Sequence, residues 1–155
     1  MSEYGFVHAS SEVLDARNAL ADQVIQALRR AGLPAFHERE TATADRAGAV
    51  VHVEPDAETA SASVSVEWRC DPGAIQTAVD SLSAGNPDAP VVRYPGVIGL
   101  HMQNALIKIL LSAGIIATQD NDTMNPEGVL VFGLMTDLPP ALRPTFVPPG
   151  RETDD

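Results

Sequence analysis

Three polar side chains recur at helical spacing within an otherwise apolar stretch, and they are the best candidates for a ligand site. His101, Asn104 and Lys108 fall three and four residues apart within 97–113, which we predict to be a helix. Side chains at that spacing lie on one helical face. An imidazole, an amide and an ammonium could together bind an anion or act on a small molecule as acid, amide and base. The same row could instead be the solvent face of a buried helix, or a polar seam at a subunit interface.

The single cysteine is the one candidate nucleophile. Cys70 lies between a predicted strand and a predicted helix, and Asp71-Pro72 follow it. A thiol near a helix N-terminus can have a lowered pKa and become a better nucleophile. Here Asp71 opposes the thiolate, and none of the four histidines is near in sequence. We therefore expect no catalytic residue, and we interpret Cys70 as a small buried side chain.

Metal binding has two weak candidates in the sequence. His37 and His52 fall in two predicted strands beside glutamates, and two imidazoles with a carboxylate could hold a divalent cation. Their spacing matches no compact ligand motif. The stretch 120–131 begins like a calcium loop, but Met124 and Asn125 stand where such a loop needs an oxygen ligand and a glycine. We expect neither a metal nor a cofactor.

Familiar enzyme motifs are missing from the chain. It contains no phosphate-binding P-loop, no dinucleotide-binding glycine motif, no nucleophile elbow, no zinc-protease helix motif and no CxxC pair. Whether the protein is an enzyme therefore stays open, and the absence of these motifs favours a protein without catalysis.

The charge balance limits the classes of partner. The chain has 21 acidic against 10 basic residues, a formal net charge of −11. This field disfavours nucleic acids and anionic membranes and favours a basic protein partner. The sequence has no apolar run long enough to span a membrane, no secretion signal at its start and no second cysteine, so we predict a cytoplasmic protein. One lysine beside nine arginines, with many alanines, is typical of a high-GC bacterial genome.

Periodicity predicts the elements that must position these residues. Apolar residues every three to four positions predict helices, and alternating or β-branched runs predict strands. The predicted helices cover 11–31, 72–84 and 97–113, and the predicted strands cover 33–38, 49–54, 61–68, 91–93 and 129–132. Short polar connections between the first three strands favour antiparallel pairing.

A helix followed by strands occurs twice, at an offset of 82 residues. The helices end alike, in Ala-Gly pairs at 31–32 and 113–114. We therefore predict one α+β domain over 1–134, an antiparallel sheet with helices packed on it. Its halves, about 11–68 and 97–134, are predicted to repeat with pseudo-twofold symmetry.

Helix 97–113 is apolar around most of its circumference, which is typical of a buried helix. In a chain this short it could be the central helix, or it could lend its second face to another subunit. We predict a homodimer with Met102, Leu106, Ile109 and Leu110 at the interface.

The C-terminal segment has a different composition. Five prolines precede a charged end, so 135–155 is predicted to be an extended, proline-rich tail that ends in acidic residues.

The order helix, three strands, helix over residues 11–85 of this acidic chain is similar to that of small secretion-chaperone folds. The resemblance rests on element order, and fold analogy alone says little about function. Two hypotheses follow. The protein is a non-catalytic protein-interaction module, an acidic accessory, immunity or chaperone-like factor of bacterial type. Alternatively it is a small-molecule-binding protein or an unrecognised enzyme that uses His101, Asn104 and Lys108.

Overall fold

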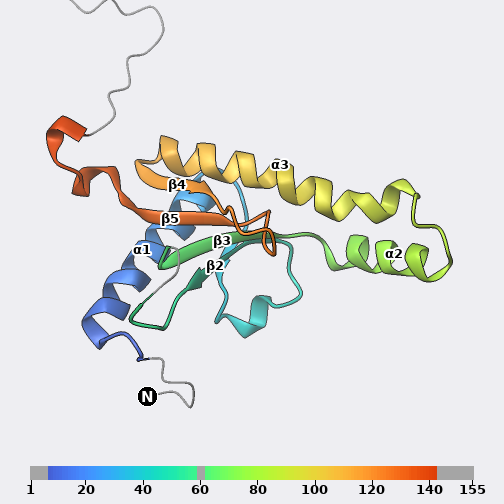
Figure 1. The fold of residues 1–155 in the computed structure, drawn as a ribbon, viewed down its shortest axis with the longest axis horizontal. Helices are drawn as coiled ribbons and strands as arrows, with labels where there is room; N and C mark the ends of the chain where they lie inside the picture. Colours follow the sequence, from blue (N-terminus) through green and yellow to red (C-terminus); the bar gives the residue numbers. More distant parts are fainter. Residues whose placement is uncertain (1–6, 59–61, 143–155) are drawn as a thin grey trace, which may run out of the picture.

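The structure, a computed structural model, describes residues 7–58 and 62–142. In this part of the chain two of three helices pack on one face of a five-stranded sheet, and the third helix packs against one of them (Figure 1). The helices are α1 (Ser11–Arg30), α2 (Pro72–Ser83) and α3 (Pro90–Ser112), and the strands are β1 (Ala35–His37), β2 (Gly48–Val53), β3 (Val64–Arg69), β4 (Ile115–Gln119) and β5 (Val129–Leu134). The α+β prediction is therefore confirmed.

The sheet is mixed, so the prediction of a purely antiparallel sheet is wrong. Its strand order is β1-β2-β3-β5-β4, and β1 runs parallel to β2 while the other neighbours are antiparallel. The reason lies in the connection over 38–47, which contains a 3₁₀ turn at Thr41–Thr43. Those residues are enough to carry the chain back along a strand of only three residues, so β2 can start beside the start of β1.

The pseudo-twofold repeat is not confirmed. In the first half the two strands after the helix are parallel, whereas the two strands after α3 form an antiparallel pair with a register shift at Ile116/Ala117. The two similar stretches of sequence therefore build two different pairings.

Alternation along the strands separates a buried sheet face from an open one. In β3, Val64 and Val66 are fully buried and Glu67 is exposed; in β5, Val131 is fully buried and Phe132 is exposed. The buried positions join α1 and α3 in a single hydrophobic core. Its largest fully buried side chains are Val24, Leu28, Val51, Val64, Val66, Leu106, Leu110, Val129 and Val131. No helix covers the opposite face of the sheet within the described residues.

Helix α1 has clear end signals in its sequence. The Ser10 side chain accepts a hydrogen bond from the Val13 amide at 3.3 Å, and Arg29 and Arg30 lie in the last turn, where the helix dipole favours cations. Gly32 follows with a φ of 93°, a left-handed conformation that ends a helix at little cost to glycine.

Helix α3 starts seven residues earlier than predicted, and the strand predicted at 91–93 is wrong. Pro90 is the first residue of the helix, where its fixed φ is favourable. Its missing N–H costs nothing there, because the first amides of a helix have no acceptor within the helix. Two valines in a row indicate a strand by propensity, but three residues are too few to outweigh the helix that continues beyond them.

Helices α2 and α3 form a helical hairpin, residues 72–112, whose tip extends past the sheet (Figure 1). Asp71 caps α2 by accepting a hydrogen bond from the Ala74 amide at 3.3 Å, and Pro72 occupies the first turn. None of the helices in the described ranges combines the length and hydropathy that crossing a membrane requires. The predicted tail is described only up to residue 142, where it forms 3₁₀ turns at Met135–Asp137 and Pro140–Leu142; residues 143–155 lie outside the described ranges.

Candidate functional site

The three predicted ligand residues lie together on one face of α3. His101, Asn104 and Lys108 are all exposed, on the side of α3 that faces away from the sheet. The Ser112 hydroxyl, one turn further, donates to the Lys108 carbonyl at 2.7 Å. Spacing therefore placed the row on one helical face correctly, and its use as a ligand site stays a prediction.

Two of the four predicted interface residues belong to the core instead. Leu106 and Leu110 are fully buried within a single chain, whereas Met102 and Ile109 are half-buried. The physical reason is that α3 crosses the sheet over β3, β5 and β4 and also contacts α1. No second subunit is needed to cover Leu106 or Leu110, because both are buried within a single chain.

A buried amide that the sequence analysis did not single out holds the loop before β5. Gln103 is 5% exposed, and its Nε2 donates to the carbonyls of Pro126 at 2.9 Å and Gly128 at 2.8 Å. The sequence does contain a signal for this contact, because Gln103 is a single amide among the apolar residues of the predicted helix. By fixing residues 126 and 128, Gln103 also fixes the position of Glu127 between them.

Glu127 lies against the backbone of α3. Its carboxylate occupies the space beside Gly99, where a Cβ would overlap Oε2, and Oε1 is 3.7 Å from the position that a Cβ would take at Gly96. The carboxylate therefore accounts for a glycine at position 99, whereas the distance at Gly96 is an ordinary van der Waals contact.

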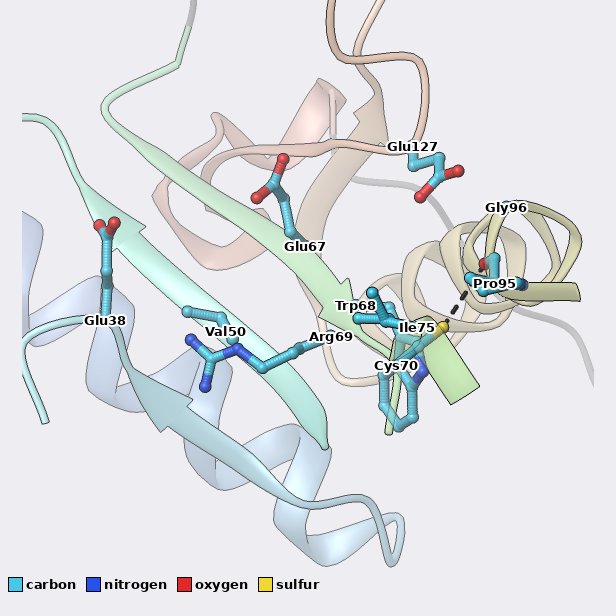
Figure 2. Close-up of a pocket in the computed structure, with 10 residues that line it drawn as sticks. All are labelled: Glu38, Val50, Glu67, Trp68, Arg69, Cys70, Ile75, Pro95, Gly96 and Glu127. Atoms are coloured by element: carbon cyan, nitrogen blue, oxygen red, sulfur yellow. Dashed lines mark hydrogen bonds between the residues drawn. The ribbon is translucent and has the colours of Figure 1, made fainter. Parts of the chain in front are cut away.

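A hollow of 420 Å³ lies between the open sheet face and the base of the α2–α3 hairpin (Figure 2). Its acidic side chains are Glu38, Glu67 and Glu127, and its apolar side chains include Val50, Ile75 and Pro95. The lining comes from six separate stretches of the chain, which explains why no local motif revealed it.

The single arginine of the hollow is engaged elsewhere. Arg69 Nη1 donates to the Thr43 carbonyl at 2.8 Å and to the Arg46 carbonyl at 3.4 Å. Figure 2 shows its side chain extending beside Val50 and away from Glu127. Arg69 thus ties the 41–46 turn to β3 and does not neutralise Glu127.

Two of the three carboxylates have no partner among the described residues. Glu38 Oε2 contacts the His52 ring, but no hydrogen bond or ion pair involves the side chain of Glu67 or Glu127. A partly enclosed hollow with unpaired carboxylates attracts a cation, because the negative field is stronger where water is partly excluded. The arrangement is suited to binding an ammonium or guanidinium group.

Cys70 lies at the edge of this hollow and is buried, as the sequence analysis interpreted it. Its Sγ donates to the Pro95 carbonyl at 3.4 Å, which links the end of β3 to α3. Burial raises the pKa of the Cys70 thiol, and the negative charge of Glu127 raises it further. Both effects oppose the thiolate, so the site does not activate this cysteine as a nucleophile.

His37 and His52 have different partners and do not form a metal pair. His37 Nδ1 accepts from the Arg39 amide at 3.2 Å, and His52 contacts Glu38. Alternation along the strands places them on opposite faces of the sheet, since His37 pairs with Val51. Within the described ranges, no group of three histidine, cysteine or acidic side chains is arranged to hold a metal ion.

The buried histidine predicts a dependence of stability on pH. Burial lowers the pKa of His37 below its ordinary value of 6.5, and the nearby charge of Arg39 lowers it further. The unfolded chain therefore binds the proton more readily, and the free energy of unfolding falls as the pH falls through 6.5. We expect His37→Asn, which keeps an acceptor for the Arg39 amide, to lose less stability than the wild type between pH of about 7.5 and 5.5 in urea titrations. Equal losses in both proteins would contradict this role.

Comparison with protein-family models, with curated proteins and with solved structures finds no match to this chain.

Proposed function

We propose that this protein is a non-catalytic protein-interaction module, an acidic accessory or chaperone-like factor of the bacterial cytoplasm, that binds a basic segment of a partner protein. The observation that carries the proposal is the 420 Å³ hollow with the unpaired carboxylates of Glu67 and Glu127. A pocket that lacks an activated nucleophile, and that holds a cysteine with a raised pKa, supports binding over catalysis.

The chemistry of the hollow fits an arginine or lysine side chain. A guanidinium can form charge-assisted hydrogen bonds with a carboxylate, and such bonds are about twice as strong as neutral ones. The apolar walls, which include Val50 and Ile75, can pack against the methylene stem of the same side chain. Glu67 belongs to a strand of the sheet, and Gln103 holds the backbone on both sides of Glu127, so the backbone of both glutamates is fixed before binding.

The net charge of −11 adds a long-range contribution. It raises the rate at which a basic partner approaches, and added salt screens it. Because the carboxylates remain partly open to water, each ion pair contributes little alone, and the affinity comes from several contacts together. We therefore expect binding that is fast and that weakens with salt.

The test uses a short arginine-rich peptide and the same peptide with citrulline in place of each arginine. Fluorescence anisotropy with the full-length protein should detect binding of the arginine peptide only, because citrulline has the same shape without the charge. Glu67→Gln together with Glu127→Gln should weaken that binding about 10-fold at ~0.05 M salt. The double variant should fold normally, since neither carboxylate holds a structural partner in the described chain.

A second double variant controls for the overall charge. Glu12→Gln with Asp15→Asn also removes two negative charges, but from exposed positions on α1. We expect this protein to bind the arginine peptide with nearly wild-type affinity. If both double variants lose affinity equally, the peptide responds to the general field, and the hollow is not the binding site.

A further inference from the structure

We infer that two copies of this chain associate through the α2–α3 hairpin. On α2, Ile75, Val79 and Leu82 follow the spacing of one helical face and are all exposed. The first part of α3 adds Val91, Tyr94, Val97 and Leu100. These seven large apolar side chains are between 40% and 56% exposed and share one short hairpin. Apolar surface gathered in this way is the usual mark of a contact with another molecule.

The rest of the described chain does not cover this surface. Ala78 is the only residue of α2 that is buried, and α3 is the only element against which α2 packs extensively. Figure 1 shows the hairpin reaching beyond the sheet, so its outer sides are open to a partner. The apolar face of α2 is therefore not used by the hydrophobic core and is available for contact with another molecule.

Charge identifies the occupant as a second copy. Residues 72–112 contain two acidic residues, Asp80 and Asp88, and two basic ones, Arg93 and Lys108, so the hairpin has no net charge. The remainder of the chain carries the whole formal charge of −11. A basic partner gains no charge attraction at a neutral hairpin, whereas two acidic copies repel each other everywhere except at such a surface. Contact through projecting hairpins also keeps the two charged sheets apart.

The proposed dimer surface shares Ile75 with the acidic hollow but none of its carboxylates, and salt distinguishes the two. Salt screens the repulsion between two copies, so it should strengthen the dimer, and it should weaken the binding of a basic peptide. A protein could therefore fail one test and pass the other.

The experiment is sedimentation velocity and native mass spectrometry on the full-length protein across a range of concentrations. We expect a species of twice the chain mass of 16.4 kDa that becomes more populated as salt increases. Val79→Glu should weaken the dimer roughly 100-fold, because it places a charge at the centre of an apolar contact. Far-UV circular dichroism should stay unchanged, since Val79 is exposed in the single chain.

Thr77→Glu is the matched control. Thr77 is exposed on the same helix, two positions from Val79, and it lies away from the face of Ile75, Val79 and Leu82. It should leave the dimer intact. Should Val79→Glu fold poorly, the neutral Val79→Ser should still weaken association without changing the circular dichroism spectrum.

A wild-type protein that stays monomeric at every concentration and salt level, or equal effects of Thr77→Glu and Val79→Glu, would overturn the inference. So would a monomer whose hairpin amides exchange slowly, because another part of the same chain would then cover the surface.

Discussion

Replacing Leu106 with alanine should lower the free energy of unfolding by about 3–5 kcal/mol. Leu106 is fully buried where α3 packs over the centre of the sheet, among the core residues Val66 and Val129. Truncating it removes apolar contacts and leaves a cavity that the surrounding strands can fill only in part. Urea titrations followed by the circular dichroism of the full-length protein would measure the loss.

Leu111→Ala is the control for this prediction. Leu111 is on the same helix but 39% exposed, so its truncation should cost about 1 kcal/mol or less. Comparing Leu106→Ala with Leu111→Ala also tests whether Leu106 is part of the core of a single chain. A small loss of stability for Leu106→Ala, accompanied by dissociation of a dimer, would show that Leu106 lies between subunits after all.

Gly48→Ala should destabilise the fold by about 3 kcal/mol or more, through backbone strain and steric overlap together. Gly48 has a φ of 148°, which L residues rarely adopt. A Cβ there would lie 2.7 Å from the Pro34 carbonyl oxygen and 2.9 Å from Cζ of Phe36. The Pro34 carbonyl cannot simply move aside, because it accepts the Ala49 amide at 2.8 Å, a bond that connects the start of β2 to the residue before β1.

Gly133→Ala separates the two causes. Gly133 has nearly the same φ as Gly48, 147°, but a Cβ there would meet nothing within 4 Å. This variant should therefore show the cost of the backbone conformation alone, on the order of 1–3 kcal/mol. The midpoints of the urea transitions give the comparison. Equal losses at the two glycines would mean that the crowding around Gly48 relaxes freely.

Local patterns were sufficient to predict the elements that carry their own signals. Alternation in 61–68 identified the strand whose Val64 and Val66 are buried, and Asp71-Pro72 identified the start of α2. The direction of β1 could not be predicted in the same way. It depends on how residues 38–47 return to the sheet, and either direction satisfies the apolar pattern of the strand.

The candidate site could not be predicted, for a different physical reason. Glu38, Glu67 and Glu127 are ordinary surface residues when each is viewed alone, and only the pairing of β3 with β2 and β5 brings them into one hollow. Helix α3 posed a related difficulty. A helix that is apolar on nearly all sides does not reveal which apolar residues face the sheet, so Leu106 was assigned to an interface while the exposed α2 was overlooked.

The strand order also determines when the sheet can be completed as the chain is made. Strand β3 lies between β2, which precedes it closely in sequence, and β5, whose Val131 pairs with Val64 only after both helices of the hairpin have been synthesised. Until then one edge of β3 has no neighbour, and Leu106 is not yet present to cover its valines. Pairing across so long a stretch is costly in chain entropy, and an open strand edge can pair with other chains. The nascent protein therefore carries an unpaired strand edge in the middle of the future sheet until β5, the last strand of the described chain, covers it.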